Sequence, residues 1–160
     1  KMAAPDSDVV VFVGDGSYLM MNSDIYSTVL TGHKLIVIVC DNGGFAVVDR
    51  VIKLKSGVSF NNLLADCRVE NAARVDFAQH AESMGAIAET VDSVAELEQA
   101  FDRAKAAAGS YVIVVRVDPD QWTPGDTWWD LGAPEVSPRE EVRRARAEND
   151  AARRNQRHGV

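Results

Sequence analysis

Two short turns carry the residues of this sequence whose types and spacing are best suited to chemistry. The first turn, Gly14-Asp15-Gly16-Ser17, combines a carboxylate with two glycines, which allow a ligand to approach the backbone closely. It leads into a helical pattern, and the free N–H groups at a helix start attract anions such as phosphate. The second turn, Asp41-Asn42-Gly43-Gly44, adds a neutral oxygen on Asn42, 27 residues after Asp15.

A carboxylate beside a phosphate group is repulsive unless a cation lies between the two. Mg²⁺ prefers the mixture that these turns offer, which is one or two protein oxygens together with phosphate oxygens and water. The two turns therefore predict a metal-bridged phosphate site to which Asp15 and Asn42 contribute oxygens.

The first turn has other interpretations. A dinucleotide-binding loop would need a third glycine where this sequence has Leu19, and Asp15 would repel a pyrophosphate that lacked a metal. A Walker-type phosphate loop is excluded, because neither Gly-Lys-Ser nor Gly-Lys-Thr occurs. A structural alternative stays open, in which Asp15 caps a helix and Asn42-Gly43 forms an ordinary turn. The occurrence of both turns after successive strands disfavours it.

The segments that must position the two turns form a strand–helix–strand unit. The β-branched run over residues 9–13 predicts a strand buried on both faces, and residues 35–40 predict a second strand of the same kind. Between them, apolar side chains recur at helical spacing from Tyr18 to Val29, and Gly32 stands where a single helix would end.

The remainder of the chain predicts further elements of the same fold. Residues 45–74 break every period and predict a long irregular loop. After it we expect a helix from Asp76 to Gly85, a short strand over 86–91, a helix opened by a Ser93–Glu96 capping box and ending near Gly109, and a strand over 111–117. This order predicts an α/β fold, a parallel sheet with helices on both faces. Ligands of such sheets bind beyond the carboxyl ends of the strands, so both turns should face one site.

Composition and cysteine content narrow the class of protein. The 160 residues, 46% hydrophobic and 26% charged, are typical of a globular domain. The apolar runs are far shorter than the roughly 20 residues of a membrane-spanning helix, and no secretory signal is visible. Cys40 and Cys67 stand at unrelated positions and form no disulfide framework. We therefore expect a cytoplasmic protein that does not enter a membrane.

Charge is unevenly distributed along the chain. Residues 139–160 carry seven arginines and four acidic residues, a net charge of +3, which leaves −10 for residues 1–138. The acidic body disfavours a nucleic-acid partner, which needs a row of cations against its phosphates. The arginine-rich end has helical spacing and predicts a solvated helix, reached through an irregular segment rich in proline and tryptophan.

The two turns together resemble the metal and cofactor signature of thiamine diphosphate enzymes. The similarity extends over residues 9–118, with Asp24-Ile25 where many members have Glu-Leu. It implies that Asp15, Asn42 and the backbone carbonyl of Gly44 hold Mg²⁺. The cofactor-binding set that it implies is Gly14, Asp15, Gly16, Ser17, Asn42 and Gly44.

A narrower resemblance is to the trihydroxycyclohexanedione hydrolases of inositol catabolism. It rests on GDGSYLMMN at residues 14–22, WTPGDTWWD at residues 122–130 and the segment 134–137 that follows. The resemblance implies a cyclic diketone substrate whose ring carbon–carbon bond is opened by water to give a deoxy-glucuronate. Two alternatives stay open: an acetolactate-synthase-like thiamine diphosphate lyase, and a non-catalytic nucleotide-binding module.

The resemblance also implies parts that these residues do not include. Such enzymes activate the cofactor through a glutamate on a separate domain, usually of a partner subunit, and the thiazolium carbon of the cofactor is the nucleophile. No catalytic side chain is therefore expected here. We expect residues 1–118 to be the cofactor domain of a larger homo-oligomeric enzyme, a dimer or a tetramer, and to be inactive alone. Residues 119–160 would form a tail that packs on another domain or subunit through Trp122, Trp128 and Trp129.

Overall fold

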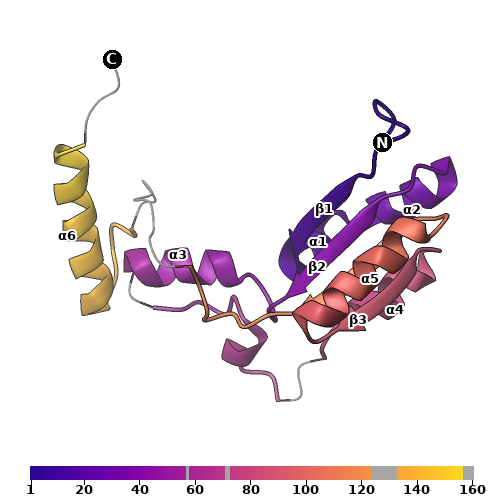
Figure 1. Cartoon of the computed structure of the whole chain (residues 1–160). Coiled ribbons are helices and arrows are strands. Elements are labelled where there is room, and N and C mark those ends of the chain that lie inside the picture. Colours follow the sequence, from indigo (N-terminus) through magenta and orange to yellow (C-terminus); the bar gives the residue numbers. More distant parts are fainter. Residues whose placement is uncertain (57, 71–72, 124–132, 157–160) are drawn as a thin grey trace. The chain divides into compact units, whose positions relative to one another are not determined.

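The computed structural model describes residues 1–56, 58–70, 73–123 and 133–156. The chain forms two compact units (Figure 1). The first comprises Lys1–Phe45 and Val69–Pro119, and the second comprises Ala46–Arg68 and Asp120–Val160. Both predicted turns belong to the first unit.

The first unit is built on a parallel sheet of four strands. These are β1 (Val10–Gly14), β2 (Ile36–Asp41), β3 (Ile87–Val91) and β4 (Tyr111–Arg116), in the order β1-β2-β4-β3. The β-branched runs of β2 and β4 are buried, as expected for central strands covered on both faces. The register places Gly14 opposite Cys40, and Cys40 opposite Val115, so the carboxyl ends of these strands meet at one edge of the sheet.

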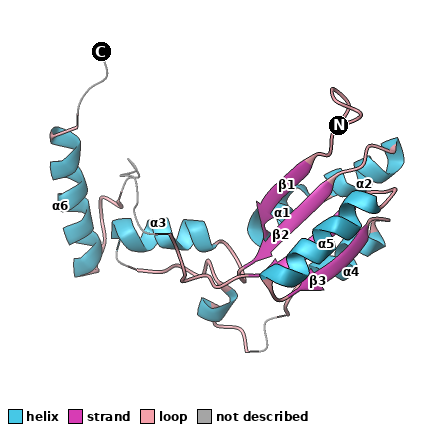
Figure 2. Cartoon of the chain, viewed as in Figure 1, coloured by secondary structure: helices cyan, strands magenta, loops and turns pink. Residues whose placement is uncertain are grey.

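Helices cover both faces of this sheet (Figure 2). Helices α1 (Asp15–Met21), α2 (Ser23–Thr31) and α4 (Phe77–Ser83) bury Tyr18, Ile25 and Phe77 against one face. Helix α5 (Val94–Ala106) buries its alanines against the other. The predicted α/β class, a parallel sheet between two layers of helices, is confirmed.

The segment after β1 differs from the single helix that its apolar spacing predicted. Asn22 separates α1 from α2, and its side-chain Nδ2 donates to the carbonyl of Leu19 at 3.1 Å. The N–H of Ile25 bonds the carbonyl of Asn22, three residues back rather than four. Helix α1 also begins at Asp15, so the predicted turn is the first turn of a helix. The predicted end at Gly32 is correct, and this glycine is left-handed with φ 69°.

Strand β1 was expected to be buried on both faces, and this expectation is wrong. Among the described residues β1 pairs only with β2, so it is an edge strand. Its Phe12 side chain is 68% exposed. A run of apolar residues therefore does not distinguish a central strand from an edge strand.

Later elements of the first unit follow the predictions closely. The Asp76 carboxylate caps α4 by accepting the N–H of Gln79 at 2.9 Å. The capping box at α5 is modified: Ser93 Oγ accepts the N–H of Glu96, but the Glu96 carboxylate accepts the N–H of Asp92 rather than that of Ser93.

The second unit contains a helix that the sequence did not predict. Helix α3 (Ala46–Ser56) occupies part of the stretch 45–74 expected to be an irregular loop, and a short 3₁₀ helix η1 (Leu64–Asp66) follows. The β-branched residues of α3 have low helix propensity. An ion pair one helical turn apart, Asp49 to Lys53 at 2.6 Å, and contacts with α6 (Glu140–Arg154) stabilise it.

Helix α6 lies where the arginine-rich spacing predicted a helix. Its Val142 and Asn149 are buried. Trp122 lies in the same unit. The guanidinium carbon of Arg50 is 4.4 Å from the centroid of the Trp122 ring. Trp128 and Trp129, and most of the tail motif, lie outside the described residues, so their packing role stays a prediction. No described helix has the length and apolar character needed to cross a bilayer.

Candidate functional site

The two predicted turns meet at the carboxyl ends of β1 and β2. Asp15 follows β1 directly, and Gly44 lies in the turn that follows β2. The backbone N–H of Gly44 donates to Asp15 Oδ2 at 2.7 Å, across 29 residues of sequence. The structure therefore brings together the two segments that the sequence singled out.

The Asp15 carboxylate is buried, with 3% of its surface exposed. Its second oxygen, Oδ1, accepts the N–H of Gly16 at 2.9 Å. Burial raises the pKa of this carboxyl, and the nearby Asp41 carboxylate raises it further, whereas the N–H groups of Gly44, Gly16 and Gly43 oppose the shift. A cation beside Asp15 would favour its charged form.

The side-chain amide of Asn42 lies between Asp15 and the Gly44 carbonyl. One of its terminal atoms is 3.0 Å from Asp15 Oδ1 and 2.8 Å from Gly44 O. With the amide nitrogen in that place, Asn42 donates to both oxygens. A half-turn of the amide puts its oxygen there instead. That oxygen then lies 3.0 Å from Asp15 Oδ1 and 2.8 Å from Gly44 O, close to the roughly 3 Å spacing of adjacent ligands around an octahedral Mg²⁺, whose ligand distances are about 2.1 Å. The donor set therefore fits a magnesium ion.

Glycines are needed in this site for two different reasons. Gly43 and Gly44 have φ angles of 80° and 146°, which side chains of L-residues rarely tolerate. Gly16 has no such angle, but a Cβ there would come within 2.5 Å of the Phe45 ring. The second reason is close packing of Gly16 against the Phe45 side chain, which is 42% exposed, and sequence spacing did not reveal it.

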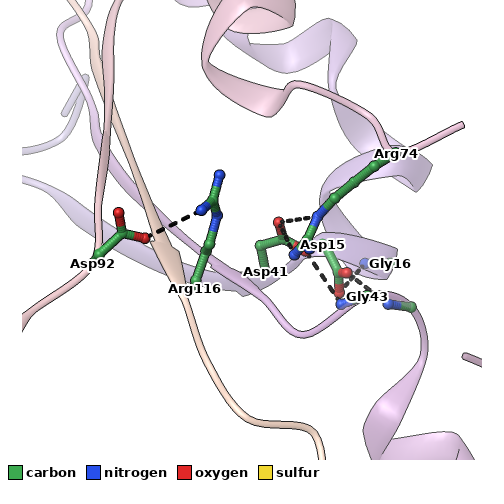
Figure 3. A network of polar contacts seen from close by, with 8 residues as sticks. Asp15, Gly16, Asp41, Gly43, Arg74, Asp92 and Arg116 are labelled. Carbon is green, nitrogen blue, oxygen red and sulfur yellow. Dashed lines mark hydrogen bonds and ion pairs between the residues drawn. The ribbon is translucent and has the colours of Figure 1, made fainter. Parts of the chain in front are cut away.

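A further carboxylate, Asp41, supports the second turn. It is 4% exposed, and its Oδ1 accepts the N–H of Gly43 at 3.2 Å. Its Oδ2 accepts two bonds from Arg74, from Nε at 3.2 Å and from Nη2 at 2.8 Å (Figure 3). The sequence did not predict this pair. The only available signal was that a carboxylate at the end of a buried strand requires a cationic partner.

A cavity of ≈ 190 Å³ opens beside the Asp41–Arg74 pair, at the carboxyl ends of β2, β3 and β4. Arg116 also lines it, but its guanidinium is turned toward Asp92, 3.5 Å away (Figure 3). In the described part of the chain, this site included, no group of three or more His, Cys, Asp or Glu residues could hold a metal, so a metal here would depend on the amide and carbonyl oxygens as well as on Asp15. The thiol of Cys40 has its pKa raised by burial and by Asp15, which disfavours a thiolate ligand there.

Comparison with known proteins now decides the family. Residues 1–115 match the model of a family described as "Thiamine pyrophosphate enzyme, C-terminal TPP binding domain". The chain belongs to this family. The match covers both turns, and it confirms the resemblance that their residues carry.

Individual relatives of this thiamine pyrophosphate domain share one name. The chain is 34% identical over 148 residues to proteins of Bacillus velezensis and Bacillus subtilis named 3D-(3,5/4)-trihydroxycyclohexane-1,2-dione hydrolase. A protein of the same name from Clostridium botulinum is 32% identical over 155 residues. These matches cover 91% of this chain and 23% to 24% of each relative, so the chain spans about a quarter of their length. They do not favour the lyase or the nucleotide-binding alternative.

Two solved structures have the same fold as this domain. A thiamine diphosphate-dependent 4-hydroxybenzoylformate decarboxylase of Rhodococcus jostii RHA1 aligns with a TM-score of 0.64 at 24% identity, over 73% of this chain and 21% of that chain. A benzoylformate decarboxylase from Polynucleobacter necessarius aligns with a TM-score of 0.62 at 22% identity, over 74% and 21%.

Proposed function

We propose that this chain is the thiamine diphosphate- and Mg²⁺-binding part of a hydrolase that opens the ring of a trihydroxycyclohexane-1,2-dione. The observation that carries the metal and cofactor proposal is the position of the Asn42 amide, one terminal atom of which lies 3.0 Å from Asp15 Oδ1 and 2.8 Å from the Gly44 carbonyl oxygen. The substrate class rests on relatives that carry this name and match 91% of the chain. In the proposed reaction, water opens a ring carbon–carbon bond and the product is a deoxy-glucuronate.

The proposed roles of the residues follow from their chemistry. Asp15, Asn42 and the Gly44 carbonyl supply oxygens to Mg²⁺. The segment Gly14, Gly16 and Ser17 contacts the diphosphate through its backbone, with the Gly16 N–H already engaged by Asp15 Oδ1. When bound, thiamine diphosphate supplies the nucleophilic carbon of the reaction. The chain itself anchors and orients the diphosphate end, and none of its side chains is assigned a catalytic role.

Two features make this an effective anchor. The N–H groups of Gly16 and Gly44 fix both oxygens of Asp15, so the carboxylate does not have to reorganise when it takes up a cation. Its burial excludes water, which strengthens every charge interaction at the site.

The complete activity is proposed for a longer enzyme. The relatives are about four times as long as this chain. We propose that the additional domains provide the activating glutamate and the rest of the substrate site, in a cytoplasmic homo-oligomer.

Calorimetric titration with thiamine diphosphate tests the cofactor assignment directly. We expect binding to the 160-residue chain in the presence of Mg²⁺ and its loss when a chelator removes the metal. Titration with a dinucleotide is the control and should give no heat of binding. Equal affinity for thiamine diphosphate with and without chelator would contradict the metal-bridged site. Assays of the longer enzyme with the ring diketone and with pyruvate then distinguish a hydrolase from an acetolactate-synthase-like lyase.

A further inference from the structure

The turn that follows β2 is held between two carboxylates. The N–H of Gly43 donates to Asp41 Oδ1 at 3.2 Å, and the next N–H, of Gly44, donates to Asp15 Oδ2 at 2.7 Å. Both acids therefore restrain the two peptide groups that directly precede the Gly44 carbonyl. Only one of them, Asp15, also lies against the Asn42 amide.

Two buried carboxylates this close to one another repel, and a single cation cannot distinguish them by charge alone. Asp41 raises the pKa of Asp15 by this repulsion. Arg74 makes the two carboxylates different, because its Nε and Nη2 both donate to Asp41 Oδ2, at 3.2 and 2.8 Å, and neutralise the charge of Asp41. Asp41 thereby has a permanent counter-ion and Asp15 has none among the contacts just described.

Arg74 reaches this position from a segment remote in sequence, 33 residues from Asp41, just before α4. Its side chain is half exposed, whereas that of Asp41 is 5% exposed. The guanidinium is planar, and its Nε and Nη2 both donate to Oδ2, which leaves Oδ1 to accept the N–H of Gly43. Figure 3 shows this contact on one side of Asp41 and Arg116, turned away toward Asp92, on the other.

We propose that Arg74 is a positioning residue for the metal site: by holding Asp41 it fixes the Gly43–Gly44 turn and leaves Asp15 as the carboxylate that takes the cation. This inference rests on the proposed function, because it concerns the same site. It adds a residue that touches none of the proposed metal ligands and acts on them through Asp41.

Charge removal at two arginines separates positioning from simple electrostatics. The Arg74→Gln substitution removes a positive charge near the proposed cation, so if only charge mattered, the affinity for a cation would rise. Positioning predicts the opposite result, a dissociation constant for Mn²⁺ that increases by about 10- to 100-fold, as is common when the partner of a metal ligand is removed. Mn²⁺ alone is the probe, because oxygen ligands of this kind accept it and the free ion is counted by its paramagnetic resonance signal.

The matched control is Arg116→Gln. Arg116 lies opposite Asp41 in the register of β2 and β4, but its guanidinium pairs with Asp92, so the substitution removes the same charge from the same cavity while both bonds from Arg74 to Asp41 stay in place. We expect it to change the Mn²⁺ dissociation constant by less than about twofold. Arg74→Lys keeps the charge but not the paired donors. We expect its Mn²⁺ dissociation constant to lie between that of the parent and that of Arg74→Gln. The double variant Asp41→Asn with Arg74→Gln should bind Mn²⁺ no more weakly than Arg74→Gln alone, since the two residues act as one unit.

Amide hydrogen exchange of Gly43 and Gly44 in the metal-free chain provides a second measurement. We expect Arg74→Gln to accelerate exchange at both glycines while the amides of β4 stay protected, which also shows that the variant is folded. Unchanged exchange together with unchanged Mn²⁺ affinity would overturn the positioning role. If the parent binds no Mn²⁺, the assignment of the metal ligands is wrong, and the calorimetric titration with thiamine diphosphate decides the cofactor proposal separately. Faster exchange in Arg74→Gln would then still support the effect on the turn, and unchanged exchange would refute it.

Discussion

The N–H of Gly44 donates to Asp15 Oδ2 across 2.7 Å, and this bond joins the ends of two adjacent parallel strands. It ties together a residue proposed as a metal ligand through its side chain and one proposed as a ligand through its carbonyl. Metal affinity and local backbone order are therefore coupled at this point. Two different substitutions of Asp15 are needed to measure the effect on each separately.

Asp15→Asn is the substitution that removes charge and retains shape. The amide oxygen can still accept an N–H, so we expect the fold to persist while Mg²⁺-dependent binding of thiamine diphosphate weakens about tenfold or more, which corresponds to the loss of a charge-assisted contact. Calorimetry measures the binding. Asp15→Ala, in contrast, leaves the N–H groups of Gly16 and Gly44 without this acceptor and should also lower the free energy of unfolding by about 1 to 3 kcal/mol. Full binding by Asp15→Asn would show that Asp15 does not contact the metal.

Gly16 offers a test of packing that is independent of any ligand. Alanine is the better helix former, so Gly16→Ala would stabilise α1 by up to about 1 kcal/mol if space allowed. A Cβ would come within 2.5 Å of the Phe45 ring, and we therefore expect a net destabilisation of about 1 to 3 kcal/mol in urea unfolding. In the Phe45→Ala background the clash is absent. There, Gly16→Ala should no longer lower the free energy of unfolding relative to Phe45→Ala alone. A neutral Gly16→Ala substitution in the parent would refute the packing argument.

Local patterns in the sequence were sufficient for much of the fold and for the position of the site. The β-branched runs at β2 and β4 are continuous because both faces are covered, and this burial is a local property of each strand. The two turns follow the first two strands, and parallel strands bring their carboxyl ends to one edge. Proximity of Asp15 to Gly44 follows from these facts without knowledge of any contact.

Features that depend on remote partners could not be predicted in the same way. Arg74 and Asp41 are separated by a stretch without a clear period, so nothing local pairs them. Helix α3 has β-branched residues that favour a strand, and its ion pair and its contacts with α6 compensate for this preference. The exposure of Phe12 depends on what lies beside β1, which the strand's own sequence does not specify.

Acid sensitivity of the first unit should depend on Glu89 of β3. Arg103 donates to both of its carboxylate oxygens, at 3.0 and 2.6 Å, and Tyr111 donates a third bond. Chiefly the bond from Arg103 lowers the pKa of Glu89 below its ordinary value of 4.5. A lowered folded-state pKa means that this contribution to stability is fully present above the unfolded value and is lost as the pH falls through the folded value.

We therefore expect the free energy of unfolding of the parent to decrease more steeply below pH 4.5 than that of Glu89→Gln. Urea unfolding at a series of pH values measures the two slopes. Arg103→Gln, which keeps the carboxyl but removes its main partner, should also show a shallower slope. Identical slopes in all three proteins would mean that Glu89 titrates alike in the folded and unfolded chain.

Order in the second unit should depend on Asp49 of α3. This carboxylate is buried, and it accepts bonds from Ser59 Oγ at 2.5 Å and from Lys53 at 2.6 Å. Ser59 connects the helix to the segment that follows it, so we expect Ser59→Ala and Asp49→Asn to increase the rate of proteolysis within residues 46–68. Lys53→Gln affects only the exposed end of the ion pair and should have a smaller effect. If Lys53→Gln increased the rate of proteolysis more than Ser59→Ala does, the bond from Ser59 would not be the main stabilising contact of Asp49.

The 160-residue chain should bind the cofactor without turning over the diketone substrate. A free acid is needed to activate thiamine diphosphate, and both carboxylates at the described site are engaged. Asp15 accepts the N–H groups of Gly16 and Gly44, and Asp41 accepts from Arg74. General acid–base catalysis typically contributes 10²- to 10⁴-fold to a rate, and the positioning of reactants contributes more, so without the additional domains proposed above turnover should fall below detection. The measurement is product formation from the ring diketone with saturating Mg²⁺ and thiamine diphosphate, with the longer enzyme as the positive control.

Addition of the separately expressed upstream part should restore part of the activity if the two parts associate. Cofactor-dependent ring opening by the 160-residue chain alone would require an activating acid within it and would contradict the division of roles proposed for this enzyme.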